Sequence, residues 1–153
     1  MIGIRPLGIT RAKAAAAPIE IAAISYSNRW QGGGYPTDDP PTIEMMTDGL
    51  TSAFYGSAVA GGVQFFRIEL TADSFVTSVN VGSSTSFGGW GALYINDAIL
   101  ARSMDGSNWT TITTLTGFLN GDIQTIPVGA VCRYLRILMA KNEYLAVGEF
   151  KPM

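Results

Sequence analysis

Hydrophobic and polar residues alternate over short stretches in most of the chain. A two-residue period predicts β-strands, because successive side chains of a strand point to opposite faces. In Val63–Leu70, for example, Phe66, Ile68 and Leu70 share one face. Turn-forming residues separate the stretches at intervals of about 8–12 residues, a spacing typical of a β-sandwich. The other predicted strands are Ile19–Tyr26, Phe75–Val81, Ala92–Ile95, Ile99–Ser103, Trp109–Leu115, Ile123–Ile126, Cys132–Met139 and Tyr144–Phe150.

The first 19 residues do not alternate in this way, and they predict an N-terminal arm followed by a single domain over residues 20–153. Met1–Thr10 is apolar but contains Gly3, Pro6 and Gly8, which suit an extended segment. A terminal segment frays unless something holds it. We therefore expect a neighbouring subunit or another partner to contact the arm, and packing on its own domain is the alternative. The side chains expected to make that contact are Ile2, Ile4, Leu7 and Ile9.

The composition indicates a surface with few charges. Hydrophobic residues make up 47% of the 153 residues and charged residues 14%, whereas roughly 25% is usual for charged residues. A chain of this length forms one domain that buries its core without a disulfide or a structural metal. The low charge leaves two interpretations open. Either the β core is well filled, or part of the surface meets another protein.

The chain contains no histidine. This absence removes Ser-His-Asp and Cys-His nucleophiles, histidine-ligated zinc and the usual general base near neutral pH. Asp38 and Asp39 are adjacent, and neighbours in an extended chain point to opposite sides, so these carboxylates do not flank one bond. The single cysteine, Cys132, excludes an intrachain disulfide and is predicted to be buried. We therefore expect a protein that is not an enzyme.

The charge pattern and the apolar runs limit the classes of partner. The net charge is −2 and the ten Lys and Arg residues are spread along the chain, whereas nucleic-acid binding needs clustered basic residues. No segment reaches the roughly 18–20 uninterrupted apolar residues of a membrane span. Arg11 and Lys13 interrupt any apolar region of a signal peptide. We expect no nucleic-acid partner, no membrane insertion and no secretion through a signal peptide.

Three motifs occur in a fixed order along the chain. Met46–Gly49 ends in an Asp-Gly turn, and Ser103–Trp109 reads Ser-x-Asp-Gly-x-x-Trp. Arg133–Ile137 has the pattern Arg-Tyr-hydrophobic-Arg, and Ala146–Phe150 contains a glutamate in a final strand. Together they resemble the discoidin (coagulation-factor type C) and galactose-binding-like family, over about residues 20–151. The resemblance implies an all-β fold, a jelly-roll β-sandwich of the galactose-binding-domain-like type.

The residues of these motifs also have a direct physical interpretation. Asp105-Gly106 predicts a tight hairpin turn, because glycine accepts positive φ and aspartate hydrogen-bonds its own backbone. Trp109 follows the turn and is expected to pack its ring on the sandwich. In the Arg-Tyr-hydrophobic-Arg strand, Leu135 shares the core face with Ile137, and the intervening Arg136, like Tyr134, points the other way.

The resemblance implies a structural calcium site. In carbohydrate-binding relatives, an aspartate near the first Asp-Gly turn and the glutamate of the last strand hold calcium, and the matching residues are Asp48 and Glu149. This sequence departs from the pattern at Leu50 and Ala53, where relatives place Asn or Asp and Thr or Ser. Calcium takes about six to eight oxygen ligands, so calcium binding stays open, and no other cofactor is expected.

Two glycine-rich loops, Ser27–Thr42 and Gly82–Gly91, carry aromatic residues and form the candidate ligand-binding surface, since family ligands sit on loops at one end of the sandwich. An aromatic ring stacks on the apolar face of a sugar, and glycine lets the backbone approach closely. Alternatively, the tryptophans close the ends of the core or fill a subunit interface. The candidate glycan-binding residues are Arg29, Trp30, Tyr35, Phe87 and Trp90.

These features lead to two hypotheses for function. The first is a non-catalytic virion protein, such as a phage capsid-decoration or tail component, which docks on other virion proteins or on copies of itself through the arm and the low-charge faces. In that case the protein resides in the virion. The alternative is a lectin-like adhesion module that binds cell-surface glycans. Single shallow sugar sites bind with roughly millimolar affinity, and many copies on one particle would add avidity.

Overall fold

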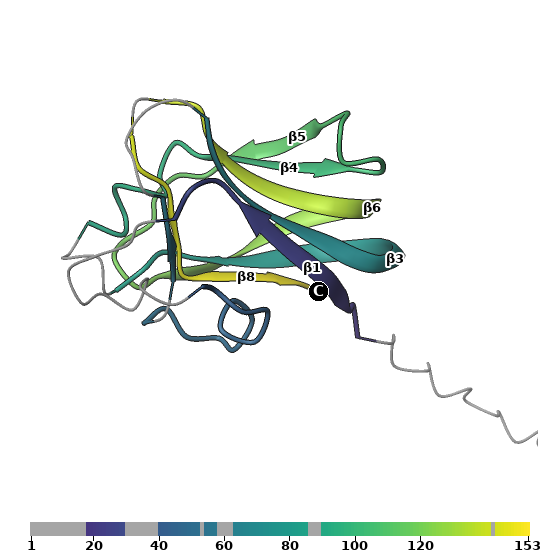
Figure 1. Ribbon diagram of the computed structural model, residues 1–153, viewed down its shortest axis with the longest axis horizontal. Helices are drawn as coiled ribbons and strands as arrows, with labels where there is room; N and C mark the ends of the chain where they lie inside the picture. The colour runs from purple at the N-terminus through teal and green to yellow at the C-terminus, as the bar shows by residue number, and fades with distance from the viewer. Residues whose placement is uncertain (1–17, 30–39, 53, 58–62, 86–89, 142) are drawn as a thin grey trace, which may run out of the picture.

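The computed structural model describes residues 18–29, 40–52, 54–57, 63–85, 90–141 and 143–153 (Figure 1). Its strands are antiparallel wherever they pair. The predicted arm, with Ile2, Ile4, Leu7 and Ile9, lies outside the described residues, which begin at Pro18. The strands are β1 Ile21–Tyr26, β2 Tyr55–Gly56, β3 Gln64–Gly82, β4 Ile99–Ser103, β5 Thr110–Thr114, β6 Ile123–Met139, β7 Ala146–Val147 and β8 Glu149–Pro152.

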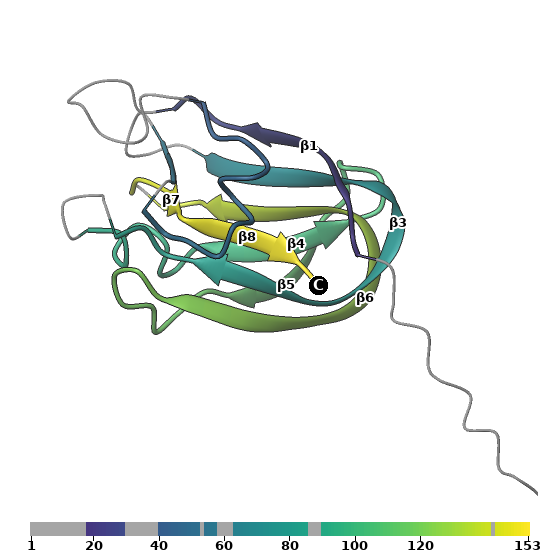
Figure 2. The ribbon, with the colours of Figure 1, turned by 90° about the horizontal axis from the view of Figure 1, so that it is seen from below.

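Two long strands, β3 and β6, run through both layers of the sandwich. In one layer the order is β1-β3-β6-β4-β5, and in the other β8 pairs with the second half of β3, which pairs with the first half of β6. The β3–β6 register shifts between Glu69 and Ser74, where the pair bends from one layer into the other (Figure 2). The sequence predicted two separate strands in place of β3 and two in place of β6, one on each side of the bend. Each pair is one continuous strand, because the hydrogen-bonded ladder resumes after the bulge.

The core lies between the two layers. Within β3 the buried positions are even-numbered at Phe66, Ile68 and Leu70 and odd-numbered at Val79 and Val81. Val76 is also buried, so the change of phase falls between Val76 and Val79, where the register with β6 shifts a second time. The all-β jelly-roll sandwich is confirmed.

Several predicted elements differ in detail. Residues Ala92–Ile95 form part of a turn and not a strand, and the hydrogen bond from Asn96 N to Ala92 O, 3.1 Å, closes one helical turn there. The predicted strand Tyr144–Phe150 is divided into β7 and β8. The sequence did not predict β2, which pairs with β7, because its two residues are too few to show an alternating pattern. Cys132 is buried as expected, and burial raises the pKa of its thiol to about 11.

The long connections gather at one end of the sandwich. β3 curves so that its first and last residues, Gln64 and Gly82, lie at the same end, and Phe66 near its start contacts Phe150, whose ring centroid is 6.1 Å away. The connections after β1, β2, β3, β5 and β6 therefore all leave from this end, called the loop end below, on the left of Figures 1 and 2. The bends of β3 and β6 and the β4–β5 hairpin lie at the other. No helix in the described ranges is long and apolar enough to cross a membrane.

Candidate ligand-binding site

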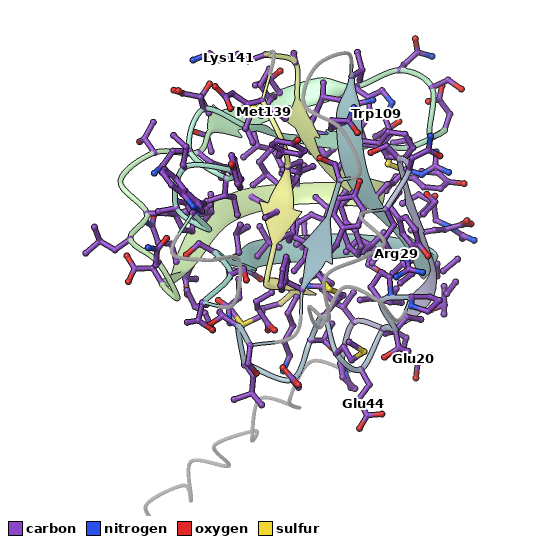
Figure 3. The ribbon with its side chains drawn as sticks, turned by 60° about the vertical axis from the view of Figure 1, so that its left-hand side comes forward. Glu20, Arg29, Glu44, Trp109, Met139 and Lys141 are labelled. Atoms are coloured by element: carbon purple, nitrogen blue, oxygen red, sulfur yellow. The ribbon has the colours of Figure 1, made fainter. Side chains whose placement is uncertain are left out.

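Three connections of the loop end are joined around Ser57, a fully buried residue. Ser57 pairs with Arg29 in an isolated antiparallel bridge. Its N–H donates to the carbonyl of Leu145 at 2.9 Å, and its hydroxyl oxygen accepts the N–H of Leu145, also at 2.9 Å. These bonds fix the position of the half-buried Arg29 at this end of the molecule, where Figure 3 labels it.

Aromatic side chains line the same end. Trp90 is 56% exposed, and its carbonyl accepts the N–H of Tyr94 at 3.1 Å. The ring of Tyr94 meets the ring of Tyr144 edge to face, with centroids 5.3 Å apart. The backbone carbonyl of Tyr94 accepts the N–H of Ala146 at 3.0 Å, which joins this turn to β7. Trp90 and Tyr94 therefore lie on one turn, and Tyr144 packs against Tyr94; we call these three residues the aromatic rim of the loop end.

A close backbone approach holds the rim in place. Gly91 follows Trp90 directly, and a Cβ at this position would overlap the carbonyl oxygen of Ser84. The side chain of Asn120 adds a bond, since its Oδ1 accepts the N–H of Ala92 at 2.7 Å. Only glycine permits this contact, so the turn that carries Trp90 is pressed against the preceding connection.

A buried polar network supports the connection from β1. The hydroxyls of Ser27 and Tyr55 lie 2.6 Å apart, and the Ser27 hydroxyl also donates to Gln64 Oε1 at 2.9 Å. The Ser27 oxygen accepts the N–H of Phe65 at 3.2 Å. Burial raises the pKa of Tyr55 to about 12, so its hydroxyl stays protonated and serves as a structural group.

The sequence predicted five glycan-binding residues, and the structure describes two of them. Arg29 and Trp90 both lie at the loop end, whereas Trp30, Tyr35 and Phe87 lie outside the described residues. Trp90 does not close the end of the core, since more than half of it is exposed. Tyr94 and Tyr144 were missed as site residues because both stretches were assigned to strands. Their signal was that each stands next to a glycine-rich or polar connection.

A second feature of the loop end is the buried carboxylate of Glu149. Its Oε2 accepts the N–H of Gly49 at 3.1 Å, which joins β8 to the Asp48-Gly49 turn. Its Oε1 is buried and has no hydrogen-bond partner within the described part of the chain. Desolvation raises the pKa of Glu149, and the neighbouring Asp48 charge adds to the effect.

This arrangement fits a cation. A buried carboxylate oxygen that accepts no hydrogen bond is stabilised when it coordinates a metal ion. Glu149 and Asp48 would supply the acidic ligands. Among the described residues no group of three or more Cys, Asp or Glu side chains gathers at one point, so backbone carbonyls would supply further oxygens, as calcium permits. Leu50 donates its N–H to Asp48 Oδ1 at 2.8 Å, and Ala53 lies outside the described residues. A bound ion would pin the first turn to the last strand.

The Asp105 carboxylate accepts a hydrogen bond from a serine hydroxyl, that of Ser103, at 3.0 Å. Asp38 and Asp39 lie outside the described residues. Asp105 is exposed, and four hydrogen bonds from Ser103, Ser107 and Asn108 hold its carboxylate, which lowers its pKa well below the usual range. A carboxylate so engaged stabilises a turn and is a poor proton acceptor.

The strand order, the two continuous bent strands and the single loop end define the class: a galactose-binding-domain-like jelly roll. No family model and no curated protein matches the sequence. Solved structures do match. A fucolectin from the serum of the striped bass Morone saxatilis is 16% identical with a TM-score of 0.63, over 85% of this chain and 45% of that chain, so this chain spans less than half of that lectin.

Two carbohydrate-binding modules are also similar over most of their length. A family 32 module from Clostridium perfringens, in complex with GalNAc-β-1,3-galactose, is 12% identical with a TM-score of 0.66, over 86% of this chain and 94% of that chain. A chitosan-binding module from a Paenibacillus chitosanase/glucanase is 18% identical with a TM-score of 0.62, over 86% and 93%. At these identities the likeness establishes the fold.

Proposed function

We propose that this protein is a non-catalytic carbohydrate-binding module whose site is the aromatic rim at the loop end. The observation that carries the proposal is the exposed Trp90 on the same turn as Tyr94, whose ring packs on Tyr144, in a fold shared with lectins and carbohydrate-binding modules. The alternative hypothesis of the sequence analysis thus becomes the leading one. Glycan binding makes cell-surface or polymer-borne glycans the expected partners.

The chemistry of the rim suits a sugar ring. One face of a pyranose carries C–H groups, and an exposed indole offers a flat apolar surface against it. The loop end also carries hydrogen-bonding groups. They are the hydroxyls of Tyr94 and Tyr144, the Asn120 side chain that binds Ala92, and Asp97, which forms an ion pair of 2.8 Å with Lys141. A shallow surface of this kind gives roughly millimolar affinity for one site, and repeated copies raise the effective affinity.

The test is a glycan array probed with wild-type protein and with Trp90→Ala. We expect binding to a subset of glycans and its loss in Trp90→Ala. Met104→Ala is the control, because Met104 is also exposed, at 46%, but lies on the β4–β5 connection at the opposite end of the sandwich. An array with no bound glycan, or equal loss in both variants, contradicts the proposal.

Assembly on a multimeric particle, such as a virion, is the second candidate, and one observation favours it. An apolar groove of about 340 Å³ adjoins Pro18, the first described residue, and its walls include Ile19, Phe75 and Met153. The leading segment of a second copy, with its four apolar side chains, is the occupant we propose. Light scattering of the full chain and of a chain lacking residues 1–17 decides: loss of oligomers on truncation supports assembly, and a monomer in both contradicts it.

A further inference from the structure

Two arginines face each other on the outer surface of the five-stranded layer, away from the loop end. Arg67 on β3 and Arg136 on β6 are direct partners in the antiparallel register, and both are partly exposed. Like charges directly opposite each other on a sheet are destabilising. Their juxtaposition therefore costs stability in the free protein, and a bound anion would recover it.

Aromatic rings hold both guanidinium groups in place. Arg136 Cζ lies 4.0 Å from the centroid of the Trp109 ring, and Arg67 Cζ lies 5.7 Å from that of Tyr134. Trp109 is the last residue of the β4–β5 connection, and Figure 3 labels it. A guanidinium stacked on a ring keeps its N–H groups at its edge, directed away from the ring. A pocket of about 180 Å³ lies here, lined by Arg67, Arg136, Trp109, Phe65 and Gly106.

Glu69, on the same strand as Arg67, already has an ion-pair partner in Arg133. Glu69 Oε1 accepts a bond from Arg133 Nη2 at 3.1 Å and from the Tyr134 hydroxyl at 3.4 Å. Neither arginine of the pocket has an ion-pair partner among the described residues. The pocket therefore carries two positive charges that no described carboxylate pairs with.

The two guanidinium groups differ in their remaining hydrogen-bonding capacity. Arg67 Nε donates to the Ser25 hydroxyl at 2.8 Å, which fixes its orientation. Arg136 Nε is buried and has no acceptor within the described ranges. Desolvation, and after it the charge of Arg67, lowers the pKa of Arg136. Both groups stay protonated at neutral pH, since arginine does not deprotonate in proteins.

We propose that the pocket lined by Arg67, Arg136, Trp109 and Phe65 binds the carboxylate of an acidic sugar residue, a uronate. Paired guanidinium edges match a planar carboxylate, which accepts two parallel N–H bonds. The aromatic rings beside them offer an apolar surface for the sugar ring that carries it. The inference rests on the proposed function in that the ligand is a glycan, and it adds a second site, specific for charge, on a different face from the aromatic rim.

The test is an NMR titration of the indole N–H signal of Trp109 with D-glucuronate, and with D-glucose as its neutral counterpart. Glucuronate should give a saturable shift and glucose none. Arg136→Gln should weaken glucuronate binding by about 10-fold or more, because a charge-assisted hydrogen bond is lost. Arg102→Gln, a partly exposed arginine on the neighbouring β4, should leave binding unchanged.

The remaining outcomes separate this site from the loop end. Glucuronate binding that Trp90→Ala abolishes and Arg136→Gln spares would overturn the second site while supporting the proposed function. Saturable binding of a poly-glutamate peptide, sensitive to Arg136→Gln, with no response to glucuronate would overturn the sugar as ligand. Loss of neutral-sugar binding in Trp90→Ala with persistent glucuronate binding would support both sites.

Discussion

The Asp48-Gly49 and Asp105-Gly106 turns share a two-residue sequence but obtain their hydrogen bonds from different parts of the chain. Both glycines have positive φ, +81° and +74°. The Asp105 carboxylate accepts its bonds from residues within three positions, among them the N–H of Asn108 at 2.7 Å. At Asp48-Gly49, the glycine N–H donates to Glu149, 100 residues further along the chain.

The two turns differ in whether the carboxylate bound to the turn has all of its hydrogen bonds. The Asp105 turn satisfies its carboxylate with its own backbone and neighbours, so it adds rigidity and has no capacity left for a ligand. The Asp48 turn leaves one oxygen of a buried carboxylate without a donor in the described part of the chain. A carboxylate whose hydrogen bonds all come from neighbouring residues therefore indicates a structural role. A buried carboxylate with a long-range bond and one oxygen that accepts none indicates a place for a ligand or a metal ion.

The largest effect is expected from closing the space beside Glu149. Gly82 pairs with Glu149 in the β3–β8 register, and a Cβ there would lie 2.7 Å from Glu149 Cβ and 3.0 Å from its backbone nitrogen. Because backbone must move, Gly82→Ala should lower the free energy of unfolding by roughly 2–3 kcal/mol, measured by urea denaturation. Thr77→Ala, exposed on the same strand, should change it by less than about 0.5 kcal/mol. Equal effects of the two would contradict the close packing.

The second effect concerns calcium. If Glu149 anchors the ion, calcium at about tenfold above its dissociation constant stabilises the wild-type protein by about 1.4 kcal/mol. Glu149→Gln should show no such gain in calorimetry, although the amide keeps the size of the side chain. Asp105→Asn, altered at the other turn, should gain as much as the wild type. A gain that survives in Glu149→Gln would place the ion elsewhere.

The smallest expected effects are on the pH dependence of stability. The contributions of Asp105 and Glu149 to the free energy of unfolding change with pH in opposite directions. The pKa of Asp105 is lowered on folding, so its contribution is present above the unfolded value of about 3.9 and is lost as the pH falls. The pKa of Glu149 is raised, so its contribution is present below about 4.3 and is lost as the pH rises through the higher folded value.

Unfolding free energies measured with chelator across that range should show both slopes. Asp105→Asn should remove the decrease in unfolding free energy that occurs on acidification. Glu149→Gln should remove the decrease that occurs as the pH rises toward neutral. Two variants with the same slope as the wild type would show that neither carboxylate is responsible.

The contrast between the turns also explains what the sequence could predict. The hairpin motif, the burial of Leu135 and Ile137 and the outward position of Arg136 follow from turn chemistry and a two-residue period, both of which are local. The continuity of β3 and β6 does not, because a bulge interrupts the period without ending the strand. The association of Tyr94 with Tyr144 and of Arg67 with Arg136 depends on tertiary register, which no local pattern encodes.

The central claim is that neutral sugars bind at the loop end and not at the hairpin end. NMR of the indole N–H groups tests it directly, because Trp90 and Trp109 mark the two regions. A titration with a neutral glycan selected on the array should shift the Trp90 signal saturably and leave the Trp109 signal in place. A shift confined to Trp109, or no saturable shift of Trp90, would contradict the account.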